Sequence, residues 1–197
     1  MEKRRDSATA YIILADGFET IEALTPLDVL RRCGVEVTTI SLNQTRAVRS
    51  SHGVTVEADA TMEDFMHNCN CCASGTVRQA LILPGGYPGY KNLCDSPEVG
   101  ALITQFHKEG KLLCAICGAP TALKANQICR GAAITCHTSV KEELSDYYSI
   151  LSSAVVKYMN IITGMGAGRS LEFAFAIAEA LTSKEKVEEI KAKMEII

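Results

Sequence analysis

One cysteine in this chain stands where a thiol could act as a nucleophile. Cys117 lies in the run 113–120, which joins an apolar strand to a helix through a turn of small residues. This arrangement presents the sulfur at the carboxyl edge of a sheet and points a helix N-terminus at it. The N–H groups there are expected to lower the thiol pKa and to bind a developing oxyanion. The alternative is a buried cysteine that fills the strand end, as we expect for Cys114.

Two other side chains could manage protons for this thiol. Glu22 follows the first expected strand, and a carboxyl in a partly dry pocket can act as general acid and base. The same residue could instead be a first-turn glutamate favoured by the helix dipole. His137 follows a later strand and could share a proton with the thiol or simply end that strand. The glycines at 85–86 and Gly118 could supply N–H groups to an oxyanion hole.

Two further segments are unusual in composition. The segment 66–72 contains Cys69, Cys71 and Cys72, which are ligand types for a soft metal. Adjacent cysteines cannot easily share one tetrahedral site, so a surface loop is the better interpretation. The Gly-rich segment 164–168 lacks the G-x-G-x-x-G pattern and the Lys-Ser/Thr ending of a phosphate-binding loop. We interpret it as a tight turn, and we predict neither a metal nor a cofactor.

Alternating strands and helices must position these groups. Strands are expected at 10–15, 35–42, 80–83, 111–115, 132–136, 154–158 and 160–163, a small hairpin at 47–56, and helices at 20–33, 97–109, 119–126, 170–181 and 184–197. Such alternation through short loops favours a parallel α/β sheet with helices on both faces. Ligands of these sheets bind beyond the carboxyl ends of the strands. The segments 16–22 and 84–89 would meet Cys117 and His137 at that edge.

The composition is that of one soluble globular domain over residues 1–197, with a charged tail at 1–8. Apolar residues make up 47% of the chain, and the net charge is −3. These values argue against nucleic acid or a membrane surface as the main partner. The charged start argues against a secretory or transit peptide. Nine cysteines, an odd number, indicate a reducing compartment, so we expect a cytoplasmic protein.

Four segments, taken together and in this order, resemble a known family: 13–22, 83–86, 115–120 and 136–137. The family is the ThiJ/PfpI superfamily, and the branch is that of the Parkinson-disease protein deglycase (DJ-one) and its bacterial relatives. The resemblance implies an α/β, flavodoxin-like three-layer sandwich with a mostly parallel central sheet and a nucleophile elbow. It also implies a homodimer, in which Asp28 matches an aspartate that approaches the site from the partner subunit.

The resemblance assigns roles to individual residues. It implies that Cys117 is the reactive cysteine of the elbow, that Glu22 is the glutamate that hydrogen-bonds it, and that His137 is the nearby histidine. Gly86 and Gly118 match the oxyanion-hole positions. We therefore expect Glu22 and His137 to be functional residues.

The function that follows is a cofactor-independent, glyoxalase III-like lyase or protein deglycase. Its substrates would be methylglyoxal-type 2-oxoaldehydes or their early adducts on amines, attacked by Cys117. A second hypothesis is an oxidative-stress sensor or redox-regulated chaperone, in which the same cysteine is oxidised to the sulfinic acid. A cysteine peptidase is less favoured, because peptidase relatives resemble this chain less around Glu22 and His137.

Overall fold

A seven-stranded sheet forms the centre of the protein. The computed structural model describes residues 8–68 and 78–196. The strands of the sheet are β1 (Thr9–Leu14), β2 (Glu36–Ser41), β5 (Ala60–Thr61), β6 (Gln79–Leu83), β7 (Leu112–Ile116), β10 (Val155–Tyr158) and β11 (Ile161–Gly164). They lie in the order β10-β11-β7-β6-β1-β2-β5, and all pairs are parallel except β10 with β11. Within the parallel part, the five strands β2-β1-β6-β7-β11 have the flavodoxin-like strand order.

The central strands β1, β6 and β7 are mostly apolar, and their side chains are buried on both faces of the sheet. In β1, Ile12 and Leu14 pack into one core and Ile13 packs into the other. Parallel strands covered on both sides show this continuous apolar pattern. The sequence prediction of a parallel, doubly covered sheet is therefore confirmed.

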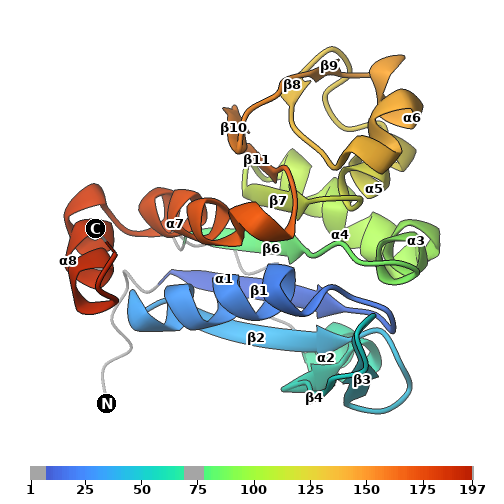
Figure 1. The fold of residues 1–197 in the computed structure, drawn as a ribbon. Coiled ribbons are helices and arrows are strands. Elements are labelled where there is room, and N and C mark those ends of the chain that lie inside the picture. The colour runs from blue at the N-terminus through green and yellow to red at the C-terminus, as the bar shows by residue number, and fades with distance from the viewer. Residues whose placement is uncertain (1–7, 69–77, 197) are drawn as a thin grey trace.

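Two helical layers cover the sheet. One face carries α1 (Thr20–Arg32), α7 (Ser170–Leu181) and α8 (Lys184–Lys193). Helices α1 and α7 lie side by side across that face (Figure 1). The other face carries α2 (Met62–Asn68), α3 (Gly89–Asp95), α4 (Pro97–Lys108) and α5 (Pro120–Ala125). The three layers form the predicted sandwich.

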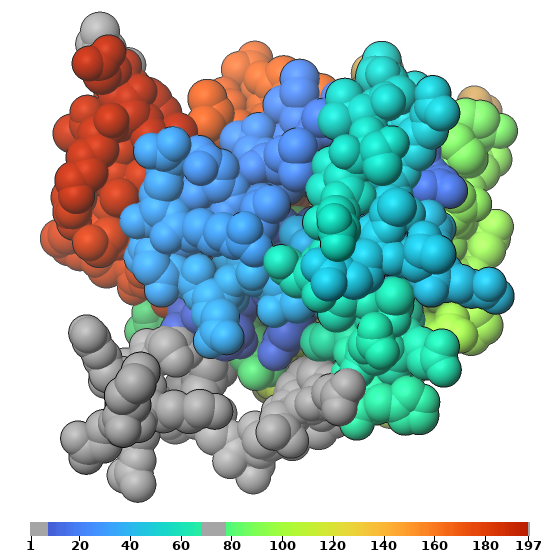
Figure 2. Space-filling model, turned by 90° about the horizontal axis from the view of Figure 1, so that it is seen from below, coloured from blue at the N-terminus to red at the C-terminus, as the bar shows by residue number. Residues whose placement is uncertain are grey.

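Two small sheets lie outside the main one. The predicted hairpin is β3 (Ala47–Arg49) and β4 (Thr55–Glu57), and it lies with α2 on the face seen in Figure 2. β8 (Ala133–Ile134) pairs with β9 (Ser149–Ile150) in an accessory lobe that also holds η1 (Thr138–Val140) and α6 (Lys141–Ser145) (Figure 1). The strand expected at 132–136 is thus shorter than predicted and does not join the central sheet.

Most helix boundaries agree with the sequence analysis. Helix α1 ends before Gly34, whose φ of +80° suits a glycine after a helix. Pro26 lies inside α1 and does not delay its start. The turn after β11 contains a short 3₁₀ helix, η2 (Ala167–Arg169). Among the described residues, no helix is long and apolar enough to cross a membrane.

Candidate active site

The turn from β7 to α5 holds Cys117 in a strained and well-anchored backbone position. Its φ is +65°, in the left-handed region that few non-glycine residues occupy. Its N–H donates to the carbonyl of Gly164 at 3.0 Å, and its own carbonyl accepts from the N–H of His137 at 2.9 Å. Main-chain contacts on both sides therefore fix the sulfur at the carboxyl edge of the sheet, as a nucleophile elbow requires.

Glu22 reaches this thiol from the first turn of α1. Its side chain is only 1% exposed, and its Oε2 accepts from the N–H of Gly85 at 2.9 Å. Gly85 makes the meeting of the two side chains possible. A Cβ at Gly85 would lie 2.6 Å from both Oε2 of Glu22 and Cβ of Cys117, so no larger residue fits between them.

Burial shifts the pKa of the Glu22 carboxyl upward. Desolvation is the main cause, the nearby charge of Glu19 adds to it, and the pKa is raised to about 7. The Cys117 thiol and the N–H groups of Gly85 and Ala167 lower it in part. Glu22 can therefore gain and lose a proton near neutral pH, which a general acid and base must do.

The expectation of a lowered thiol pKa is wrong. Burial, and then the charge and hydrogen bonding of Glu22, raise the pKa of Cys117 to about 12. The N–H groups of Gly86 and Gly118 act in the opposite direction but do not outweigh them. The amide donors at the turn are visible in the sequence, whereas the desolvation of a thiol that faces a carboxylate arises only in the folded protein.

The N–H groups of Gly86 and Gly118 both approach the Cys117 sulfur. Gly86 follows β6 and Gly118 follows Cys117, and both N–H groups act on the thiol from separate segments. Their expected role, to stabilise an oxygen that becomes negative on a carbon bonded to this sulfur, stays a prediction.

His137 is joined to the elbow through its main chain, and its imidazole is exposed. Its Nδ1 accepts from the N–H of Ser139 at 3.2 Å and lies 2.8 Å from Oγ of Ser139, which caps η1. In the neutral ring the proton is therefore placed on Nε2. From the position that a Cβ of Gly166 would take, Cδ2 of His137 is 3.5 Å away and Oε1 of Glu22 is 3.9 Å away.

The Gly-rich turn after β11 belongs to this site, a role that sequence reasoning missed. It binds the Cys117 N–H through Gly164, and it places Gly166 between Glu22 and His137. The available signal was its position: a glycine-rich segment after a strand lies at the same sheet edge as the other site residues.

The remaining predicted positions lie elsewhere. Asp28 is exposed on α1, and its carboxylate accepts from Nε of Arg32 at 2.7 Å. Its expected contribution to a partner's site stays a prediction. The cysteines 69, 71 and 72 lie outside the described residues. In the part of the chain that the structure describes, no group of three or more His, Cys, Asp or Glu side chains is placed to hold a metal.

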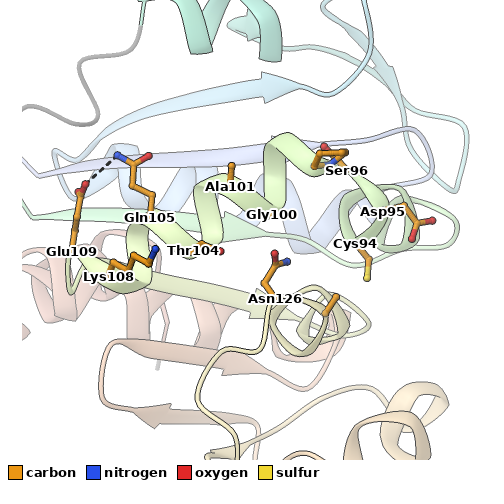
Figure 3. A pocket seen from close by; sticks show the side chains of 12 residues that line it. Cys94, Asp95, Ser96, Gly100, Ala101, Thr104, Gln105, Lys108, Glu109 and Asn126 are labelled. Atoms are coloured by element: carbon orange, nitrogen blue, oxygen red, sulfur yellow. Dashed lines mark hydrogen bonds between the residues drawn. The ribbon is translucent and has the colours of Figure 1, made fainter.

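A separate hollow of about 830 Å³ lies between α4 and α5 (Figure 3). Cys94 and Asp95 are at one end, and Gln105 donates to Glu109 at the other, at 3.1 Å. None of Cys117, Glu22 and His137 lines it. The predicted catalytic residues therefore lie at the elbow and not in this hollow.

A buried acid, an elbow thiol and two facing N–H groups at the edge of a flavodoxin-like sheet define a cysteine-centred α/β protein. The sequence profile of the DJ-1/PfpI family matches residues 8–180, and the chain belongs to that family.

Several relatives resemble the chain over nearly its full length. It is 37% identical to protein dj-1beta of Drosophila melanogaster (93% of this chain, 95% of that one) and 35% identical to the Parkinson disease protein 7 homolog of Danio rerio (94% and 95%). It is 33% identical to the glutathione-independent glyoxalase DJR-1.2 of Caenorhabditis elegans (90% and 91%). The crystal structure of Drosophila melanogaster DJ-1beta superimposes with a TM-score of 0.89 at 35% identity, covering 97% of this chain and 99% of that one.

Proposed function

We propose that this protein is a cofactor-independent glyoxalase that converts methylglyoxal-type 2-oxoaldehydes into 2-hydroxy acids. The observation that carries the proposal is the buried Glu22 carboxyl, with a pKa near 7, against the Cys117 thiol. The family includes a glyoxalase-type enzyme, which supports enzymatic activity of this kind. The same chemistry would also reverse early adducts of these aldehydes on amines, which is a deglycase activity.

The reaction begins with attack of the Cys117 sulfur on the aldehyde carbon. The S–C bond forms, and the C=O electron pair moves to oxygen, where the N–H groups of Gly86 and Gly118 stabilise it. A charged Glu22 raises the pKa of the Cys117 thiol. The thiol therefore ionises most easily when its proton passes to Glu22, which makes Glu22 neutral. The acid form of Glu22 then protonates the new oxyanion, which completes a hemithioacetal.

The second half moves a proton between neighbouring carbons. Glu22 as carboxylate, or His137, removes the proton from the former aldehyde carbon, and the adjacent carbon receives a proton in return. The hemithioacetal becomes a thioester of the 2-hydroxy acid. Water hydrolyses this thioester and restores the thiol, so methylglyoxal plus water gives lactate. One carbon is oxidised and its neighbour reduced, and no external oxidant is consumed.

The direct test measures lactate formed from methylglyoxal. Cys117→Ala is expected to lower the rate at least about a hundredfold, and Glu22→Gln by about a hundredfold or more. Cys129→Ala is a matched control, since Cys129 is also a half-buried cysteine at positive φ, with Nε2 of His107 at 3.7 Å from its sulfur. That control should keep the wild-type rate. No lactate from the wild type, or full activity in Cys117→Ala, would overturn the proposal.

A second candidate function, redox sensing, is favoured by the same surroundings of the sulfur. A sulfinate at Cys117 would accept from the two glycine N–H groups and from a protonated Glu22. In each oxidation step the sulfur attacks peroxide, an S–O bond forms, the O–O bond breaks and hydroxide leaves; two equivalents give the sulfinic acid. Mass spectrometry after mild peroxide would support this function if Cys117 oxidised selectively over Cys129, and would exclude it if both oxidised alike.

We further propose a cytoplasmic homodimer. The six described cysteines outside 69–77 are free thiols, which suits a reducing compartment. A hollow of about 540 Å³ between the starts of α1 and α7 contains Ile21 and Leu171, which are 53% and 42% exposed. Asp28 also lines it. Ile21→Asp is expected to produce monomers in sedimentation analysis, and a wild-type monomer would contradict the proposal.

A further inference from the structure

A tyrosine ring lies directly against the residue after the nucleophile. A Cβ at Gly118 would lie 2.7 to 2.9 Å from three ring carbons of Tyr90, closer than real side chains approach. The Tyr90 ring therefore occupies the volume that a side chain at position 118 would need. Gly118 also supplies an N–H that acts on the Cys117 sulfur. Tyr90 consequently borders one of the two proposed oxyanion donors.

The backbone of Tyr90 is tied to the other donor segment. Its N–H donates to the carbonyl of Gly86 at 2.8 Å. Burial raises the pKa of its hydroxyl; the charge of Lys91 opposes this rise, and the charges of Glu143, Cys117 and Tyr87 add to it. The ring is half-buried.

A second tyrosine extends this surface toward solvent. Tyr87 is 67% exposed, and its ring centroid lies 6.4 Å from that of Tyr90 with an interplanar angle of 57°. Nζ of Lys91 is 5.8 Å from the Tyr87 ring centroid. An exposed aromatic ring packed on a half-buried one forms a continuous apolar surface, which we name the tyrosine shelf (Tyr87 and Tyr90).

We propose that the tyrosine shelf selects 2-oxoaldehydes that carry an aryl group on the ketone carbon over those that carry a methyl group. This inference rests on the proposed function and adds its substrate class. When the sulfur adds to the aldehyde carbon, that carbon stays bonded to the ketone carbon, which carries the methyl or aryl group. The first atom of this group is then two bonds from the carbon that bears sulfur. A flat ring there can contact the shelf, and a methyl group is too short to cover it. Tyr87 is the specificity-determining residue, since it offers the exposed ring.

The expected magnitude follows from aromatic contact energies. Two aromatic rings in offset or edge contact gain contact free energy in addition to that of the surface area they bury. This added free energy changes a rate or binding constant about 3- to 10-fold. Tyr90 contacts both Gly118 and Gly86, so a substitution of Tyr90 would disturb the whole site. Tyr87 is therefore the better position for a test.

The first experiment compares kcat/KM for phenylglyoxal and methylglyoxal. Wild-type protein should prefer phenylglyoxal, and Tyr87→Ala should lower the phenylglyoxal-to-methylglyoxal ratio about 3- to 10-fold. Tyr87→Phe keeps the ring and should keep the ratio. Tyr158→Ala is the control, because Tyr158 is an exposed tyrosine paired with Ile161, at the opposite end of β11 from Gly164. An unchanged ratio in Tyr87→Ala, or an equal fall in Tyr158→Ala, overturns the proposal.

The second experiment does not depend on turnover. Cys117 is alkylated with 2-bromoacetophenone or bromoacetone, in which the S–C bond forms at the methylene carbon and bromide leaves. Each rate, followed by mass spectrometry, is divided by the rate with free N-acetylcysteine. The shelf predicts an aryl preference in the wild type that falls about 3- to 10-fold in Tyr87→Ala.

The two experiments separate the two proposals. If neither aldehyde yields a hydroxy acid, the glyoxalase function fails, and the labelling ratio still decides whether the shelf recognises aryl groups. If lactate forms normally and both ratios are unaffected by Tyr87→Ala, the shelf proposal fails alone.

Discussion

The N–H of Gly85 donates to Oε2 of Glu22 at 2.9 Å. This hydrogen bond makes the two oxygens of the buried carboxyl different from each other. Oε1 is also buried, and it makes no hydrogen bond of good geometry to the described residues. Cys117 and the Ala167 N–H approach the carboxyl and lower its pKa in part. A proton on Glu22 is therefore best placed on Oε1, which lies 3.9 Å from the position that a Cβ of Gly166 would take.

Glu22→Gln should make the thiol more reactive and the protein less active. The charge and hydrogen bonding of Glu22 raise the pKa of Cys117, so a neutral amide should shift the pH profile of Cys117 alkylation by iodoacetamide to lower pH. Lactate formation should fall, because an amide carries no proton between carbons. Slower alkylation together with lower activity would show that Glu22 activates the thiol instead.

The stability of the protein should depend on Glu22 in the acid range. The folded pKa of about 7 exceeds the ordinary value of 4.5, so the folded state binds more protons between these values. Wild-type stability should therefore fall as pH rises from about 4.5 to about 7, by at most about 3 kcal/mol relative to Glu22→Gln. Urea denaturation at several pH values measures the difference. Glu36→Gln, at the exposed start of β2, is the control variant.

Two substitutions of His137 should affect stability and activity differently. Its Nδ1 caps η1 by accepting from Ser139, and an asparagine side chain can make the same kind of cap. His137→Asn should thus keep the melting temperature while lactate formation falls about a hundredfold. His137→Ala should lose activity and also about 1 kcal/mol of stability. Wild-type activity in His137→Asn would remove the imidazole from the mechanism.

Gly118→Ala should destabilise the fold through Tyr90. The added methyl would meet the ring at 2.7 Å, and overpacking of this kind costs about 1–3 kcal/mol. In a Tyr90→Ala background the same change should cost much less. A double-mutant cycle from urea denaturation measures this coupling. A coupling free energy of zero would mean that Gly118 is required for another reason.

The left-handed backbone at Cys117 predicts an unusual order of variants. Glycine adopts a φ of +65° without strain, whereas alanine does not, so Cys117→Gly should be about 1 kcal/mol more stable than Cys117→Ala. In the interior of α4, Ala101→Gly should do the reverse and lose about 1 kcal/mol. Equal stability of the two Cys117 variants would indicate that the turn relaxes.

Most strands of the central sheet and the covering helices α1, α4, α5, α7 and α8 could be predicted because their patterns are local, whereas β5, α2 and α3 were not predicted. Each buried strand is a short apolar run, and α1, α4 and α7 repeat apolar residues at helical spacing. Helix α3 was missed because Gly89 and the preceding proline suggest a turn. Strand β9 was missed because a two-residue strand carries no periodic signal, and β8 was predicted as part of a longer strand at 132–136.

At the site, residue types were easier to predict than their electrostatics. The thiol, acid and glycine N–H groups each follow a strand, and the topology brings strand ends together. The direction of the Cys117 pKa depends on how deeply it is enclosed and on which charge faces it. Both are tertiary properties that no local pattern contains. The contact of Tyr90 with Gly118 is equally non-local, since it joins α3 to the turn after β7.

The bare α-carbon of Gly85 has a consequence for how this centre tolerates change. The Glu22 carboxyl and the Cys117 side chain approach each other across the position that a Cβ of Gly85 would occupy. Even one added methyl group would push them apart. Loss of chemistry there needs no alteration of the sulfur or the acid. A variant carrying alanine at that single position would retain every functional group and still be disabled.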